Sequence, residues 1–257
     1  MYMKQLLFLA LILFSITSTA KPMHECIKQE QRTKIAIVDT GIMTEFINRE
    51  FMCKCGHRNF VHGTDDVKDT HGHGSNLAWL ITRDLNPKTH CLLIYKYYSS
   101  GSGFSNIMNG VQSFMMAVRL GAKYINYSGG GDEESPAETK VLQDALSKGI
   151  RIVVAGGNDG RDLDKKCNYF PACIKTNSPH FYAVGNCRDG KYAKSSNYGG
   201  PVNQCRDGMY KGPSSPHLLR MSGTSQSTAI FMNDLIKKEV KDAKIRSKIK
   251  CDTCYSR

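Results

Sequence analysis

Short runs of apolar and β-branched residues recur along the chain, and most of them end at a glycine or another turn residue. Runs of this length and composition are typical of strands that a sheet buries on both faces. We therefore predict strands at residues 34–39, 92–98, 123–127 and 151–155, and a weaker one at residues 181–184.

Stretches with helical spacing of apolar residues lie between these runs. Two of them cover residues 74–83 and 105–120. A third begins at Ser135-Pro136-Ala137-Glu138, which combines an N-cap serine, a proline at the first helical position and a capping glutamate. This helix should run to residue 148, and the glycine at 149 should end it.

The alternation of strands and helices predicts an α/β fold of three layers, with a mainly parallel central sheet flanked by helices. Parallel sheets carry their active sites at the carboxyl ends of the strands. Asp39 ends the first predicted strand, residues 128–131 follow the third, and residues 156–158 follow the fourth. No repeat or linker interrupts the pattern, so we expect a single domain over residues 21–257.

The first twenty residues have the pattern of a signal peptide. Lys4 precedes an apolar run at residues 6–14, and Ser18-Thr19-Ala20 offers small residues for cleavage after Ala20. The alternative is a membrane anchor, but a spanning helix needs about 20 apolar residues. We therefore expect a secreted or periplasmic protein.

All ten cysteines follow this segment, which predicts disulfides in an oxidising compartment and leaves their pairing open. The alternative is zinc or redox chemistry. Cys53 and Cys55 lie near His57 and His62, and Cys251 begins a C-x-x-C motif. Their spacing fits no complete zinc pattern, so we expect no metal centre.

The formal net charge of +12 raises the question of a nucleic acid or an anionic surface as partner. The basic residues are spread along the chain, except at residues 237–250, where acidic and apolar residues at helical spacing indicate a solvated helix face. We expect a monomer with no nucleic-acid partner and no stable membrane association.

A candidate nucleophile lies in MSGTSQSTA at residues 221–229. Ser225 stands at the start of a predicted helix, where free backbone N–H groups favour a developing oxyanion. Taken alone, Ser225 or Thr224 could merely cap the helix.

A base and an orienting carboxylate are also present. His73 lies between two glycines before an apolar helix, and His71 is a rival base. Asp39 could hold the imidazole tautomer, although a turn aspartate or an aspartic-protease D-T-G motif are alternatives. The second of these needs two such carboxylates, and the chain has one D-T-G. Asn158 follows a buried strand and could donate to an oxyanion or simply form a turn.

Taken together, these segments resemble the subtilisin-like serine proteases, in the order Asp, His, Asn, Ser, over residues 34–240. This order differs from that of chymotrypsin, and a serine at 227 replaces the last glycine of an α/β-hydrolase motif. The segments are IVDTG at Asp39, GHGSNLA at His73, SGSG at 100–103, NYSGGG at 126–131, AGGN ending at Asn158, SSNYG at 195–199 and SGTSQSTA at Ser225.

The resemblance implies a subtilisin-like fold and a secreted serine endopeptidase that cuts proteins or peptides through an acyl-enzyme. It makes Ser225 the nucleophile, His73 the general base and acid, and Asp39 the orienting carboxylate. Asn158 and the Ser225 backbone N–H would form the oxyanion hole. The segments that would flank a substrate as neighbouring strands are Ser100, Gly101, Ser102 and Gly103, and Ser128, Gly129 and Gly130.

The resemblance leaves several points open. No cofactor is implied, and no recognisable calcium loop is present, which leaves a structural calcium ion open. An inactive exported binding protein on the same scaffold is the main alternative function, although all four catalytic positions are occupied. Ser75, Asn76 and Trp79 depart from the residues usual after the catalytic histidine, and Ala229 replaces a proline, changes from which we expect altered pocket shape only.

An acidic run follows the second substrate segment. Asp132 and Glu133 could select Lys or Arg immediately before the cut, as in kexin-like members of the family. The alternative is that they only charge the first turn of the helix that begins near Ser135, where the helix dipole favours acidic side chains.

Overall fold

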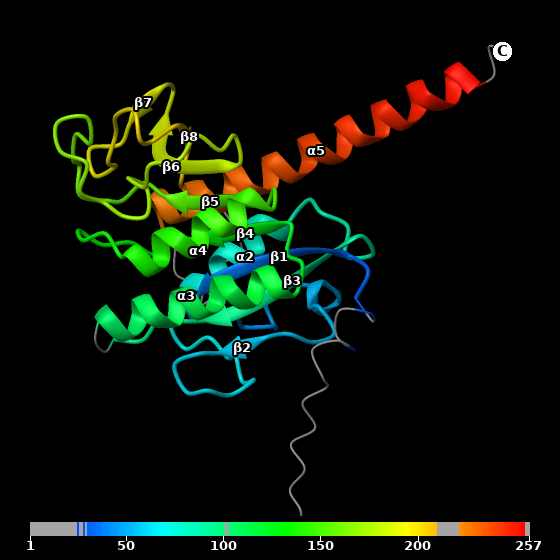
Figure 1. Cartoon of the computed structure of the whole chain (residues 1–257), viewed down its shortest axis with the longest axis horizontal. Coiled ribbons are helices and arrows are strands. Elements are labelled where there is room, and N and C mark those ends of the chain that lie inside the picture. Colours follow the sequence, from blue (N-terminus) through cyan, green and yellow to red (C-terminus); the bar gives the residue numbers. More distant parts are fainter. Residues whose placement is uncertain (1–24, 26–27, 29, 101–102, 210–220, 255–257) are drawn as a thin grey trace, which may run out of the picture.

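The computed structural model describes residues 25, 28, 30–100, 103–209 and 221–254, with side chains described as far as residue 246 (Figure 1). The predicted signal peptide and two residues of the first substrate segment, Gly101 and Ser102, lie outside the described residues. So do the side chains of the C-x-x-C motif at Cys251.

The strands form one mostly parallel sheet in the order β2-β3-β1-β4-β5-β6-β7, and β8 pairs with β6. Among the strand pairs of the described residues, only the short β6–β7 pair is antiparallel. The α/β fold expected from the sequence is therefore confirmed. The strands are β1 (Thr33–Asp39), β2 (Arg58–Asn59), β3 (His90–Lys96), β4 (Tyr124–Tyr127), β5 (Arg151–Ala155), β6 (Phe181–Arg188), β7 (Lys191–Tyr192) and β8 (Gln204–Arg206).

The predicted helices are also present, with ends that differ by one or two residues. The N-cap at Ser135 is confirmed, since its hydroxyl accepts the Glu138 N–H at 3.3 Å. The last helix is much longer than the motif that begins it, and Figure 1 shows its end extending away from the other elements. The helices are η1 (Arg49–Phe51), α2 (His73–Thr82), α3 (Gly103–Arg119), α4 (Pro136–Ser147) and α5 (Thr224–Cys254).

Two helical layers cover the two faces of the sheet. Strand β1 shows the division, because Ala36 and Val38 lie in the apolar core under α3 and α4. Its alternate residues, Ile35 and Ile37, lie in a second core under α2 and α5. Side chains alternate across a strand, so one apolar strand supplies both cores. This sandwich brings the starts of α2, α4 and α5 to the carboxyl edge of the sheet.

Disulfides occur as predicted. They join Cys53 to Cys91, Cys167 to Cys173 and Cys187 to Cys205. Cys55 is disulfide-bonded as well. These bonds fit an oxidising compartment.

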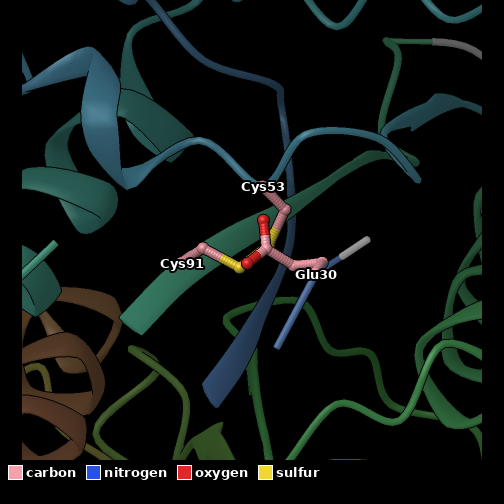
Figure 2. A group of neighbouring side chains, drawn as sticks. All are labelled: Glu30, Cys53 and Cys91. Atoms are coloured by element: carbon pink, nitrogen blue, oxygen red, sulfur yellow. A yellow bond between two sulfur atoms is a disulfide. The ribbon is translucent and has the colours of Figure 1, made fainter. Parts of the chain in front are cut away.

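The disulfides also bear on the zinc alternative. Figure 2 shows Glu30 beside the Cys53–Cys91 disulfide, the one candidate cluster of metal ligands among the described residues. Its sulfurs are bonded to each other, and hydrogen bonding from Arg32, opposed by burial, lowers the pKa of Glu30 to about 2. His57 is also engaged, since its Nε2 lies 2.9 Å from the Cys53 carbonyl and its Nδ1 accepts from the Ile94 N–H. Neither the cluster nor His57 offers a free ligand.

Within the described residues, no helix is both long enough and apolar enough to cross a bilayer.

Candidate active site

Asp39 and His73 meet at the carboxyl end of β1. The His73 Nδ1 lies 2.7 Å from the Asp39 Oδ1, which also accepts the Thr40 N–H at 2.8 Å. Asp39 is only 3% exposed. An imidazole that donates from Nδ1 to a carboxylate carries its lone pair on Nε2, the tautomer that a general base requires.

A second carboxylate, Asp69, shapes the loop that delivers His73. Its Oδ1 accepts the His71 and Gly72 N–H groups at 2.8 Å each, and its Oδ2 accepts from the Ser75 N–H and hydroxyl at 3.0 and 2.6 Å. Asp69 is 1% exposed. It therefore satisfies the free backbone donors at the start of α2 and fixes the first turn of the helix.

Glycine is required on each side of His73, for a different reason at each position. Gly72 has φ 90°, a left-handed conformation that side chains disfavour. A Cβ on Gly74 would lie 2.5 Å from the Gly41 carbonyl oxygen and 3.2 Å from Asp39. Close approach of α2 to the Asp39 turn therefore requires glycine at 74.

The pKa of His73 is raised above its ordinary value. Burial alone lowers it, but the charge of Asp39, its hydrogen bond and the charge of Asp69 outweigh burial. The rival base, His71, is exposed, and its ring centroid lies 6.2 Å from that of His73. Of the two histidines, His73 is the one bonded to Asp39.

Ser225 lies in the first turn of α5 and is 7% exposed. No described residue accepts its backbone N–H, as expected for the second residue of a helix. The next residue ties this turn to α2, because the Gln226 Nε2 donates to the Asn76 Oδ1 at 3.1 Å. Among the described residues, no hydrogen bond joins the Ser225 hydroxyl to His73.

Asn158 contacts the same turn of α5. Its Oδ1 accepts from the Thr224 N–H at 2.9 Å and from the Thr224 hydroxyl at 3.2 Å. The Gly157 N–H donates to that hydroxyl at 3.2 Å. These bonds assign the amide orientation and leave the two Nδ2 hydrogens of Asn158 without an acceptor among the described residues.

The second substrate segment lies beside aromatic rings. A Cβ on Gly129 would fall within 2.0 Å of the Tyr97 hydroxyl, and one on Gly130 within 2.7 Å of the Tyr169 ring. The Ser128 hydroxyl is buried without a partner among the described residues. In the first segment, Ser100 is exposed and Gly103 begins α3. Glycine is therefore required at positions 129 and 130, because Tyr97 and Tyr169 approach the backbone closely there.

The first residue of the acidic run, Asp132, forms an ion pair within the chain. Asp132 pairs with Arg161 through two contacts of 2.7 and 3.3 Å between carboxylate and guanidinium. Both groups are at the surface, and the pairing with Arg161 lowers the pKa of Asp132. The Asp132 carboxylate is therefore already paired with an arginine of the chain itself.

Comparison with known proteins places this chain in a family. Residues 30–231 match the profile of the Subtilase family, Peptidase_S8. The chain belongs to the subtilase family. The resemblance noted in the sequence motifs is thereby confirmed over most of the chain.

Individual relatives of this subtilase are distant. Subtilisin DY of Bacillus licheniformis is 30% identical over 148 residues, covering 54% of this chain and 52% of the relative. Thermitase of Thermoactinomyces vulgaris is 28% identical over 208 residues, covering 76% and 70%. The chain spans between about a third and a half of the length of the first curated relatives that it matches.

A solved structure supports the fold. The crystal structure of a cold adapted subtilisin-like serine proteinase matches this subtilase with a TM-score of 0.61 and 24% sequence identity, covering 78% of this chain and 72% of that one. At this identity the match establishes the three-layer subtilisin-like fold.

Several residues that shape this subtilase site have roles that the sequence did not predict. Ser75 and Asn76 were expected to alter pocket shape only, yet they are buried and bond Asp69 and Gln226. Asp69 stood two residues before His71, the spacing of an Asx turn, which was a usable signal. Nothing in the sequence indicated that Tyr169 would lie beside Gly130.

Proposed function

We propose that this chain is a secreted serine endopeptidase that hydrolyses peptide bonds through an acyl-enzyme on Ser225. The observation that carries the proposal is the 2.7 Å bond between His73 Nδ1 and Asp39. It prepares an imidazole for proton transfer at the edge of the sheet where α5 presents Ser225. Membership in the subtilase family supports the same chemistry.

The first half of the reaction uses this chain's own groups. His73 Nε2 takes the proton of the Ser225 hydroxyl as Oγ attacks the scissile carbonyl, and Asp39 stabilises the imidazolium that forms. The oxyanion of the tetrahedral intermediate accepts hydrogen bonds from the Asn158 Nδ2 and the Ser225 backbone N–H. His73 then gives its proton to the leaving amine, and an ester on Ser225 remains.

Water completes the cycle. His73 removes a proton from a water molecule, the resulting oxygen attacks the ester, and the same oxyanion donors act again. Collapse of this second intermediate returns the proton to Ser225 and releases the new carboxylate. The absence of a hydrogen bond between Ser225 and His73 is compatible with this cycle, because such bonds often tighten only when substrate binds.

The substrate is a protein or peptide in an extended conformation. Residues 100–103 and 128–130 would add to it as neighbouring strands, so that main-chain hydrogen bonds supply much of the affinity. We expect the enzyme to act as a monomer, without nucleic acid and without a cofactor in the chemistry. The signal-like N-terminus and the disulfides support export.

Hydrolysis of a peptide library by the purified, correctly exported protein tests the proposal, with Ser225→Ala as the control. We expect cleavage at defined positions by the wild-type protein and none by the variant. Equal hydrolysis by Ser225→Ala would refute the mechanism. A folded wild-type protein that binds peptides but cuts none would instead support the alternative of an inactive binding protein.

A further inference from the structure

A cavity of about 200 Å³ lies between the start of α3 and the segment after β4. Gly103 of the first proposed substrate segment lines one side, and Gly130 of the second lines the other. Four aromatic residues contribute to its wall: Tyr97, Tyr98, Tyr127 and Phe170. A side chain of an extended peptide held between the two segments would therefore have access to this cavity.

Glu138 gives the cavity an acidic wall. It is 5% exposed and lines the cavity from the first turn of α4. The sequence predicted that this carboxylate would cap the helix by reaching back to Ser135. Instead only the serine half of the capping box forms, and the Glu138 side chain is buried.

One oxygen of this buried carboxyl is unpaired. The Glu138 Oε1 has no hydrogen-bond partner among the described residues. Tyr127 hydrogen-bonds the carboxyl, which lowers its pKa, but burial has the larger effect and raises the pKa to about 7. A buried acceptor without a donor is unfavourable, so a ligand that supplies a donor is favoured.

Charge limits what that ligand can be. None of the described residues that line the cavity is a lysine or an arginine, and Glu133 adds a second carboxylate at the exposed side. A cationic donor therefore fits. A calcium ion would want six to eight oxygen ligands, and a magnesium ion an octahedral set, whereas one buried carboxylate stands here.

The shape of the cationic group decides between arginine and lysine as the ligand. An arginine guanidinium is best satisfied by a carboxylate that offers both oxygens, whereas Glu138 has one oxygen, Oε1, that is buried without a partner among the described residues. A lysine ammonium is a compact charge that needs one strong acceptor, and its apolar stem can lie against aromatic rings. The rings of Tyr97 and Tyr127 also attract a cation through their faces.

We propose that this cavity binds a lysine side chain of the substrate, on a residue at some distance from the scissile bond, and that Glu138 is the residue that selects it. This proposal rests on the proposed endopeptidase function and adds a substrate class to it. It differs from selection by Asp132 or Glu133 immediately before the cut, since Asp132 is bonded to Arg161.

Peptides that differ at one position test the proposal. Lysine, norleucine and arginine are placed in turn at each of the positions flanking the cut, and kcat/KM is measured with wild-type protein, Glu138→Gln and Glu134→Gln. Norleucine keeps most of the apolar stem and lacks the charge. Glu134→Gln removes one negative charge from the same segment, at an exposed residue outside the cavity.

We expect one position, not adjacent to the cut, at which lysine exceeds norleucine by about tenfold to a hundredfold, the factor that follows from one charge-assisted hydrogen bond. Arginine should fall below lysine there. Glu138→Gln should abolish the lysine preference while it still cleaves the norleucine peptide, which shows that the variant is folded. Glu134→Gln should keep the preference.

Two results would overturn the proposal while leaving the proposed function intact. One is cleavage of all peptides with no lysine preference at any position. The other is a preference that survives in Glu138→Gln. The remaining case is that the wild-type protein binds the peptides but does not cleave them. Dissociation constants of the same peptides, measured with Ser225→Ala, decide it. Tighter binding of lysine that depends on Glu138, without cleavage by the wild-type protein, would support the cavity and refute the endopeptidase.

Discussion

Besides Asp39, two carboxylates of the described residues are buried near the site: Asp69 before α2 and Glu138 in the first turn of α4. The chain surrounds these two in opposite ways. Asp69 accepts four hydrogen bonds from His71, Gly72 and Ser75. Burial raises its pKa, but these donors together lower it below the ordinary value. Glu138 keeps one oxygen without a described partner, and burial raises its pKa to about 7.

This difference in pairing distinguishes a carboxylate that supports the scaffold from one that is able to bind a ligand. A carboxylate whose lone pairs are all filled by its own chain can hold a helix start in place, but it has nothing left to offer a ligand. A buried carboxylate left partly unpaired weakens the fold slightly and gains a partner only when something binds. The Asp69 carboxylate at the start of α2 is therefore fully paired before substrate arrives, whereas the Glu138 carboxyl beside the cavity is not.

The largest expected effect on activity is that of His73, in the helix that Asp69 holds in place. His73→Ala should reduce kcat by on the order of 10⁶, a magnitude taken from subtilisin itself, because nucleophile and base act as one unit. His71→Ala should retain most of the activity, since His71 is exposed and has no bond to Asp39. Steady-state kinetics of both variants decide the matter, and the reverse ranking would show that His71 is the base.

Asn158 should show the next largest effect. Asn158→Ala should lower kcat by about 10²–10³ with little change in KM, because the amide meets the substrate oxygen only after it becomes tetrahedral. Subtilisin is again the source of this magnitude. The kinetic constants of the variant provide the test. A raised KM with an unchanged kcat would place Asn158 in substrate binding instead.

Stability should separate the two carboxylates directly. Asp69→Asn replaces an acceptor with an amide that faces donor N–H groups, and should destabilise the protein by about 3 kcal/mol. Glu138→Leu removes a buried carboxyl with an unpaired oxygen, and should leave stability unchanged or raise it by about 1 kcal/mol. Denaturant unfolding with the disulfides intact measures both. Equal losses of unfolding free energy in the two variants would contradict the distinction between Asp69 and Glu138.

The pH dependence of stability should show the same contrast more weakly. The pKa of Glu138 is about 7 in the folded protein against an ordinary 4.5, so the folded state holds this proton more tightly. Its stabilising contribution is complete below about pH 4.5 and is lost as pH rises through about 7. Between about pH 5 and 7, the wild-type protein should lose on the order of 2 kcal/mol relative to Glu138→Gln.

Asp69 should behave in the opposite sense. Its lowered pKa means that its contribution is complete above the ordinary value and is lost only as pH falls through the lowered one. Unfolding free energies of wild-type protein, Glu138→Gln and Asp69→Asn, measured from about pH 2 to about pH 8, test both signs. Parallel pH curves for wild-type protein and Glu138→Gln would contradict the account of Glu138.

Much of the fold followed from local pattern. The strand at residues 151–155 was predicted to the residue, and β1 begins one residue before its predicted start. Such apolar β-branched runs have few other solutions in an alternating α/β chain. The strand predicted at 181–184 continues to Arg188, because β8 and β7 pair with its second half, and neither partner had a visible pattern of its own.

The site was predictable where motifs carry it and unpredictable where packing does. Asp39 and His73 meet as expected. Glu138 was misassigned, because S-x-x-E predicts a capping box whether or not a cavity lies behind the helix. The sequence around Glu138 holds no record of the aromatic residues that line that cavity, which are Tyr97 and Tyr98 after β3, Tyr127 at the end of β4, and Phe170. Buried polar contacts between distant segments need the tertiary structure to be seen.

The most direct test of the central claim is labelling with a fluorophosphonate, which reacts only with a serine primed as a nucleophile. The purified protein should gain the mass of one probe per chain, and peptide mapping should place it on Ser225. His73→Ala should lose the label while remaining folded. A folded wild-type protein that stays unlabelled, or that carries the probe on another residue, would contradict the assignment of Asp39, His73 and Ser225 as one catalytic unit.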